Sequence, residues 1–126
     1  MNQSIVKEAE QYAINQFSRN LPPYAKYHNL DHTQTVVSEV RQLAAAEGLN
    51  REETAYLEVA AWFHDLGYLT KAEGHEELSA QLAEDFLNER NVGEDDRNKI
   101  KRIILATELS HEPEDFHEKL IRDADL

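Results

Sequence analysis

Histidine and aspartate residues stand at three separated places in this chain of 126 residues. His28 and His32 are four positions apart, so a helix would place both rings on one side. His64 and Asp65 are adjacent within an apolar run, and Asp125 follows another apolar segment. Buried ionisable groups cost several kcal/mol unless they are paired, hydrogen-bonded or bound to metal. The placement of these residues therefore raises the possibility of a metal site.

A metal ion would satisfy all three places at once, because helical bundles hold metals with side chains that project inward from facing helices. Mixed imidazole and carboxylate ligands suit Mn, Fe, Zn, Co or Ni. Each residue alone also has a simpler explanation. A histidine on an apolar helix is more often a hydrogen-bonded core residue, and Asp123 near the end of the chain could pair with Arg122.

The elements that must position these residues are helices. Apolar residues recur at helical spacing in six segments, near residues 3–20, 31–47, 52–66, 75–92, 95–107 and 114–126. We expect Asp31 and Asn50 to be the N-caps of the second and third helices. Gly48 is a plausible residue just past the second helix, and Phe116 belongs to the apolar stripe of the sixth. The pattern predicts a single all-α bundle of about six helices.

Composition narrows the classes of partner. The net charge of −12 disfavours nucleic acid polymers as partners, although a metal dication could still hold a small phosphate. No stretch approaches the ~20 apolar residues of a membrane helix, so we expect no membrane partner. The absence of cysteine excludes disulfides and thiolate zinc sites and fits a cytoplasmic location.

Three motifs taken together resemble the HD-domain phosphohydrolase superfamily. They are Tyr27-His28-Asn29-Leu30-Asp31-His32, then Trp62-Phe63-His64-Asp65-Leu66-Gly67-Tyr68, then Asp123-Ala124-Asp125-Leu126. Their order matches the signature H…HD…D of that superfamily, across nearly the whole chain. The first motif is also similar to that of the cyclic-nucleotide phosphodiesterases, which share the helical core.

The resemblance implies a role for each matching residue. His32, His64, Asp65 and Asp125 correspond to metal ligands, with Asp65 as the natural bridge if two metals bind and Asp123 as the fallback for Asp125. His28 corresponds to the phosphodiesterase histidine that protonates the leaving oxygen. A divalent metal lowers the pKa of a bound water to about 7 and polarises phosphoryl oxygens, so we expect His28 and Asp65 to serve catalysis.

The predicted activity is hydrolysis of a phosphate ester of a nucleotide or similar small molecule. Two other functions remain open. Some superfamily members are di-iron oxygenases, which would need His75 and His111 as ligands of a second metal. A non-catalytic sensor or interaction module with the same fold is the third hypothesis.

Three further histidines follow the His64-Asp65 pair. The resemblance implies that His75 and His111 hold a second metal, with Mg as one candidate, or contact phosphate; the alternative is that both are surface loop residues. For His75, a phosphate contact agrees with its place at a helix N-terminus, where amide dipoles favour anions. His117 lies in an acidic run and is expected to be solvated.

The resemblance also concerns the extent of the domain. Members of the superfamily usually continue past the final aspartate with at least one more helix. We therefore expect residues 1–126 to be an HD domain that lacks its C-terminal helices. A homodimer is a further expectation, because the exposed faces of amphipathic helices often support one.

Overall fold

The computed structural model describes residues 1–20 and 29–125. His28, the predicted proton donor, lies outside the described residues, and so does Tyr27 of the first motif. His32, His64, Asp65 and Asp125 are all within them.

Helices account for the secondary structure of the described residues. They are α1 (Ser4–Asn20), α2 (Leu30–Ala46), α3 (Arg51–Phe63), the short 3₁₀ helix η1 (Leu66–Leu69), α4 (His75–Glu89), α5 (Glu94–Leu105) and α6 (Phe116–Asp125). Neither described range contains a strand. The predicted all-α fold of about six helices is confirmed.

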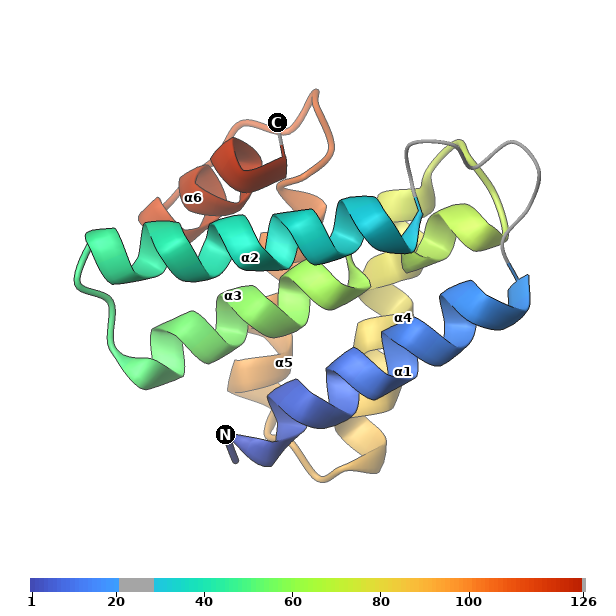
Figure 1. The fold of residues 1–126 in the computed structure, drawn as a ribbon, viewed down its shortest axis with the longest axis horizontal. Coiled ribbons are helices and arrows are strands. Elements are labelled where there is room, and N and C mark those ends of the chain that lie inside the picture. Colours follow the sequence, from blue (N-terminus) through green and yellow to red (C-terminus); the bar gives the residue numbers. More distant parts are fainter. Residues whose placement is uncertain (21–28, 126) are drawn as a thin grey trace.

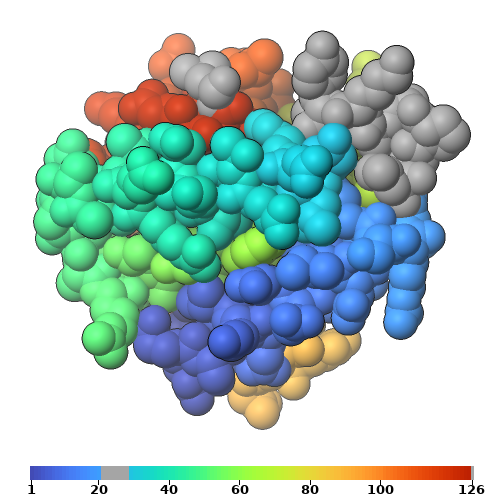
Figure 2. Space-filling view, in the orientation of Figure 1, coloured from blue at the N-terminus to red at the C-terminus, as the bar shows by residue number. Residues whose placement is uncertain are grey.

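Helix α3 lies at the centre of the bundle. In Figure 1, α2 and α1 flank α3, α6 runs along α2, and α4 and α5 lie behind. The space-filling view shows only a narrow strip of α3 between α2 and α1 (Figure 2). Every residue from Val59 to Phe63 is buried, so the polar pair that follows this helix starts from the interior of the molecule.

An aromatic cluster fixes the end of α3. The ring centroid of Phe63 lies 5.4 Å from that of Tyr12 on α1 and 5.1 Å from that of Phe86 on α4. The centroids of Tyr12 and Phe86 are 5.3 Å apart. Each such pair contributes about 0.5–1.5 kcal/mol beyond its buried area. The cluster therefore holds the backbone immediately before His64 in a defined position.

A second close contact joins the segment after His64 to α4. A Cβ atom on Gly67 would lie only 2.2 Å from the carbonyl oxygen of His75 and 2.8 Å from the amide nitrogen of Ser79. The amide of Gly67 donates a 2.8 Å hydrogen bond to the Ser79 hydroxyl. Since η1 and α4 meet backbone to backbone, His75 at the start of α4 is fixed relative to the polar pair.

Two helix boundaries differ from the sequence prediction. Asn29, and not Asp31, is the N-cap of α2, because its side chain accepts a hydrogen bond from the His32 amide at 2.9 Å; Asp31 lies in the first turn. Helix α3 begins after Asn50, which forms the expected cap and a capping box. It ends at Phe63 rather than near residue 66, because the chain turns into η1 to reach its contact with α4.

The apolar stripe of α6 is shorter than predicted. Leu120, Ile121 and Ala124 are buried, whereas Phe116 is 46% exposed. Phe116 is the first residue of α6, one turn before the part of the helix that packs on the core. Among the described residues, no helix is long and apolar enough to cross a membrane.

Candidate metal centre

Four helix ends meet at one place. His32 lies in the first turn of α2, His64 and Asp65 directly follow α3, and Asp125 is the last residue of α6. His75 begins α4. Residues from both halves of the sequence are thereby brought to one edge of the bundle.

The ring nitrogens of two histidines face the same carboxylate oxygen. Asp125 Oδ1 lies 3.0 Å from His32 Nε2 and 3.1 Å from His64 Nε2. Ligand atoms of these three residues all lie within 4.8 Å of one another. Asp65 Oδ2 faces the same nitrogens, at 3.4 Å from His64 Nε2 and 3.7 Å from His32 Nε2. The four residues thus form one converging donor set, which we call the metal centre.

The other oxygen of Asp65 points to a second cluster. Asp65 Oδ1 is 3.1 Å from His75 Nε2, and the Glu76 carboxylate is 3.4 Å from the same nitrogen. The two oxygens of one buried carboxylate therefore serve two groups of side chains. This is the arrangement that a bridging carboxylate requires.

Backbone carbonyls set the tautomer of two rings. His64 Nδ1 donates to the carbonyl oxygen of Ala61 at 2.7 Å, and His75 Nδ1 donates to that of Ala72 at 3.0 Å. A carbonyl can only accept, so the Nδ1 atom of each ring must carry a proton. The Nε2 atom of each ring is then directed at the carboxylates. Backbone carbonyls commonly orient metal-binding histidines in this way.

Charge within the centre shifts the pKa values of its members. Burial lowers the pKa of His64, but the charge of Asp65 and the hydrogen bond and charge of Asp125 outweigh it and raise the pKa to about 9. Burial raises the pKa of Asp125, yet hydrogen bonds from His32 and His64 bring it down to about 2. Burial lowers the pKa of His75, and contacts with Asp65, Ala72 and Glu76 raise it overall.

The contacts of His64 call for a positive charge in the metal centre, which agrees with the direction of its pKa shift. The Nε2 atom of His64 has two carboxylate oxygens in front of it, and a neutral ring with its proton on Nδ1 would direct a lone pair at both. Either a proton or a cation must stand between them. Two imidazoles and two carboxylates are a donor set suited to a divalent transition metal, so the residues fit such an ion.

The centre opens towards one side. The side chains of His64 and Asp65 are 1% and 3% exposed, whereas those of His32 and Asp125 are 30% and 26% exposed. A ligand can therefore approach along the start of α2 and the end of α6. The buried residues His64 and Asp65 close the opposite side of the centre.

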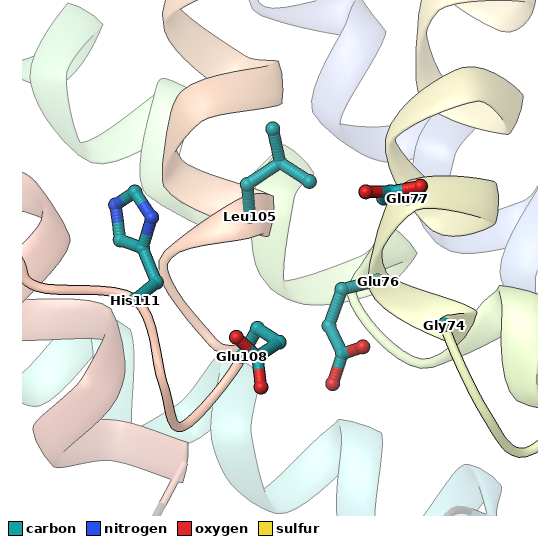
Figure 3. Close-up of a pocket in the computed structure, with 6 residues that line it drawn as sticks. All are labelled: Gly74, Glu76, Glu77, Leu105, Glu108 and His111. Carbon is teal, nitrogen blue, oxygen red and sulfur yellow. The ribbon is translucent and has the colours of Figure 1, made fainter.

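Two cavities lie near residues of the site. One of about 400 Å³ lies between the start of α4 and the loop of residues 106–115 (Figure 3); it is lined by Gly74, Glu76, Glu77, Leu105, Glu108 and His111. A smaller one of about 200 Å³ touches the centre itself and is lined by Thr107, Leu109, Arg122, Asp123 and Asp125. The 106–115 loop contributes to both cavities.

The remaining predicted residues have different surroundings. Asp123 is exposed, so the structure gives it no place in the donor set, and Asp125 is the aspartate that joins it. His111 lines the larger cavity, and its Nε2 atom is 2.9 Å from Glu118. The prediction that His117 is solvated was wrong: its Nε2 atom lies 2.9 Å from Glu53 at the start of α3, and its side chain is 13% exposed.

Sequence reasoning missed Glu76, Glu118 and Arg122 as residues near the site. Glu76 adjoins the already suspected His75, which was a usable signal. Glu118 gave no clear signal, because it lies between His117 and Lys119 at the end of an acidic run. Arg122 gave no signal, because its partners are backbone carbonyls of a loop.

Comparison with known proteins adds a family. The family model for the HD domain matches residues 29–126. No curated protein and no solved structure matched the chain. HD domains bind divalent metals, which agrees with the donor set. Since the match covers most of the chain and includes His32, His64, Asp65 and Asp125, the chain belongs to the HD-domain superfamily.

Proposed function

We propose that this protein is a metal-dependent phosphohydrolase that cleaves a phosphate ester of a nucleotide or similar small molecule. The observation that carries the proposal is the convergence of His32, His64, Asp65 and Asp125 on one partly open position. Membership of the HD-domain superfamily, most of whose members are metal-dependent phosphohydrolases, supports the same activity.

The four residues of the centre and His28 would have different roles in the reaction. His32, His64, Asp65 and Asp125 would hold a divalent metal such as Mn, Fe, Zn, Co or Ni. When bound, such a metal lowers the pKa of a coordinated water and polarises phosphoryl oxygens. The negative side chains of Asp65 and Asp125 would orient the water, and His28 would donate a proton to the leaving oxygen.

A second cation is compatible with the two-sided contacts of Asp65. His75 Nε2 and Asp65 Oδ1 are 3.1 Å apart beside Glu76, and Mg is one candidate for this position. Alternatively, His75 would contact the phosphate of the substrate directly. The smaller cavity, which includes Asp125, offers space next to the centre, and the larger one, beside Glu76, is in the size range usual for small-molecule sites.

The oxygenase alternative would need His111 as a ligand. Its Nε2 atom is engaged with Glu118 in this structure, so this alternative would require that contact to break or the other ring nitrogen to serve. No contact within the described residues favours it over hydrolysis. The sensor alternative differs from the proposal only in the absence of turnover.

The test begins with protein stripped of metal by a chelator. Mn²⁺, Co²⁺, Ni²⁺, Fe²⁺ or Mg²⁺ is added back, and phosphate monoesters and diesters, including nucleotides and cyclic nucleotides, are assayed for hydrolysis. Asp125→Asn should abolish both tight metal binding and turnover. Asp123→Asn is the matched control for metal binding: it makes the same change two positions away on an exposed side chain and should leave metal affinity unchanged.

Three results would contradict the proposal. Metal binding without hydrolysis of any ester would favour the sensor. Two irons per chain, with oxygen consumption that depends on His111, would favour the oxygenase. A folded protein that ignores every added metal would remove the metal centre itself.

A further inference from the structure

We propose that His111, Glu118 and Arg122 form a positioning clamp that holds the 106–115 loop on α6 and thereby sets the place of Asp125. The proposal rests on the metal centre of the proposed function. It assigns His111 a role as a positioning residue and not as a metal ligand. None of the three residues touches the metal position directly.

The clamp has a buried carboxylate at its centre. Glu118 is 2% exposed. Its Oε1 atom accepts from His111 Nε2 at 2.9 Å and from the amide of Glu114 at 3.3 Å. An unpaired carboxylate would be costly at such a depth. Glu118 can therefore remain buried only while the loop stays in place to supply these donors.

Arg122 closes the clamp one turn later. Its guanidinium donates to the carbonyl oxygen of His111 and, at 3.4 Å, to that of Leu109. His111 is consequently held twice, through its ring by Glu118 and through its backbone by Arg122. Because the acceptors of Arg122 are loop carbonyls, the loop conformation and the helix position depend on one another.

The same face of α6 carries the metal ligand. Glu118, Arg122 and Asp125 are spaced four and three positions apart, which places them in one row along a helix. Glu118 is buried, as are Leu120, Ile121 and Ala124 of the same helix. Two members of the row bind the loop, and the third faces His32 and His64. A shift of the loop would therefore move the row that carries Asp125.

The clamp also borders the space next to the centre. His111 and Glu108 line the larger cavity opposite Glu76 (Figure 3). Arg122 and Leu109 line the smaller cavity together with Asp125. We therefore expect the clamp to influence how a substrate fits as well as how tightly the metal is held.

The test uses His111→Leu and Glu118→Leu, each of which removes one side of the contact. Co²⁺ affinity and the visible spectrum of the Co²⁺-loaded full chain are measured beside the unfolding of the metal-free protein. We expect each variant to weaken Co²⁺ binding about tenfold, the usual effect of losing a group that orients a metal ligand. The Co²⁺ spectrum should change and the number of tightly held ions should not.

Three controls separate positioning from other roles. Glu118→Gln should behave nearly as the parent, because both contacts go to a single oxygen that an amide can replace. The double variant should be little worse than either single one, since both remove the same contact. His117→Leu breaks another histidine–glutamate contact on α6, the one with Glu53, and should leave the Co²⁺ spectrum unchanged.

The opposite results would overturn the clamp. These are Co²⁺ affinity within twofold of the parent in folded His111→Leu, an equal effect of His117→Leu, or loss of a second metal in His111→Leu alone. If Glu118→Leu does not fold, His111→Leu decides the matter, because its ring is 35% exposed. Absence of phosphoester turnover would contradict the proposed function and leave this measurement intact, whereas absence of Co²⁺ binding would contradict both.

Discussion

The metal centre and the clamp both join histidine to carboxylate, but they differ in how many groups converge. In the clamp, one imidazole nitrogen meets one oxygen of Glu118, and a backbone amide also donates to that oxygen. In the metal centre, two imidazole nitrogens and two carboxylates face a common position. In the clamp a single ring proton completes the contact, whereas the metal centre needs a positive charge, from a proton or a metal ion, at its common position.

This difference shows why a buried histidine–carboxylate pair is weak evidence for a metal. Glu118 is as deeply buried as Asp65, with 2% of each residue exposed. Burial alone therefore does not distinguish the two. What distinguishes them is how many histidine nitrogens and carboxylates converge on one position.

Of the variants that compare the metal centre with the clamp, the isosteric changes Asp65→Asn and Glu118→Gln should differ most in metal affinity and turnover. Asp65→Asn removes a charge that faces His32, His64 and His75. We expect it to lower metal affinity and turnover by at least about 100-fold, because loss of a ligand should cost more than the roughly 10- to 100-fold that loss of an orienting group costs. Glu118→Gln should change either quantity by less than about threefold. Similar losses in both variants, measured by titration with Co²⁺ and by steady-state kinetics, would erase the distinction.

The pH dependence should show that a proton and a metal compete in the centre. Because the folded state raises the pKa of His64 from 6.5 to about 9, the stability that its protonated form adds is complete below pH 6.5 and is lost as pH rises towards 9. Asp125, with its pKa lowered from 3.8 to about 2, contributes above pH 3.8 and loses its contribution as pH falls through 2.

Metal binding should follow the opposite trend. A metal must displace the His64 proton, so its affinity should rise about tenfold per pH unit until pH is near 9. Urea unfolding of the metal-free protein and Co²⁺ titration across this range supply the two curves. Flat metal affinity between pH 7 and 9 would mean that His64 is not a ligand.

The glycine that brings η1 against α4 should be far more sensitive than a glycine elsewhere. Gly67→Ala would force a Cβ atom onto the backbone of α4, and overpacking of this kind costs about 1–3 kcal/mol. Gly93→Ala is the control, since a Cβ there meets nothing within 4 Å. This change should lower the free energy of unfolding by less than about 1 kcal/mol. Chemical denaturation measures both, and equal losses would contradict the close contact.

Two helix caps provide the smallest and most specific contrast. Asn29→Ala and Asn50→Ala each remove a side chain that caps a helix N-terminus, and each should cost about 1 kcal/mol of stability. Only Asn29 accepts from the amide of a metal ligand, His32. We therefore expect a few-fold weaker Co²⁺ affinity for Asn29→Ala alone. An equal change in both variants would show that the effect is general destabilisation.

The sequence predicted the periodic part of the fold and the motif residues of the centre. Apolar spacing located the six helices, since each must bury one stripe against the others. The His64-Asp65 pair and Asp125 stood out because charged groups in apolar segments need partners. The family signature then separated Asp125 from Asp123, although both lie on the same short helix.

The remaining features depend on contacts that spacing does not encode. Asn29 and Asp31 are both good caps, and only the backbone decides which amide is reached. Helix propensity alone does not explain why α3 stops before His64; the contact of Gly67 with α4 does. His117 lies in an acidic run, but Glu53, 64 positions earlier, is its partner. Such long-range pairing cannot be inferred from local composition.

The separation of the ligands along the chain has a consequence for the unfolded state. His32 and His64 contact an aspartate that lies 93 and 61 positions further along the chain. A metal held by all three acts as a cross-link that closes two long loops, in a chain that has no cysteine to form one. Cross-links over long loops restrict the entropy of the unfolded chain most in theory. Removal of the metal should therefore release the end of α6 first and make unfolding less cooperative.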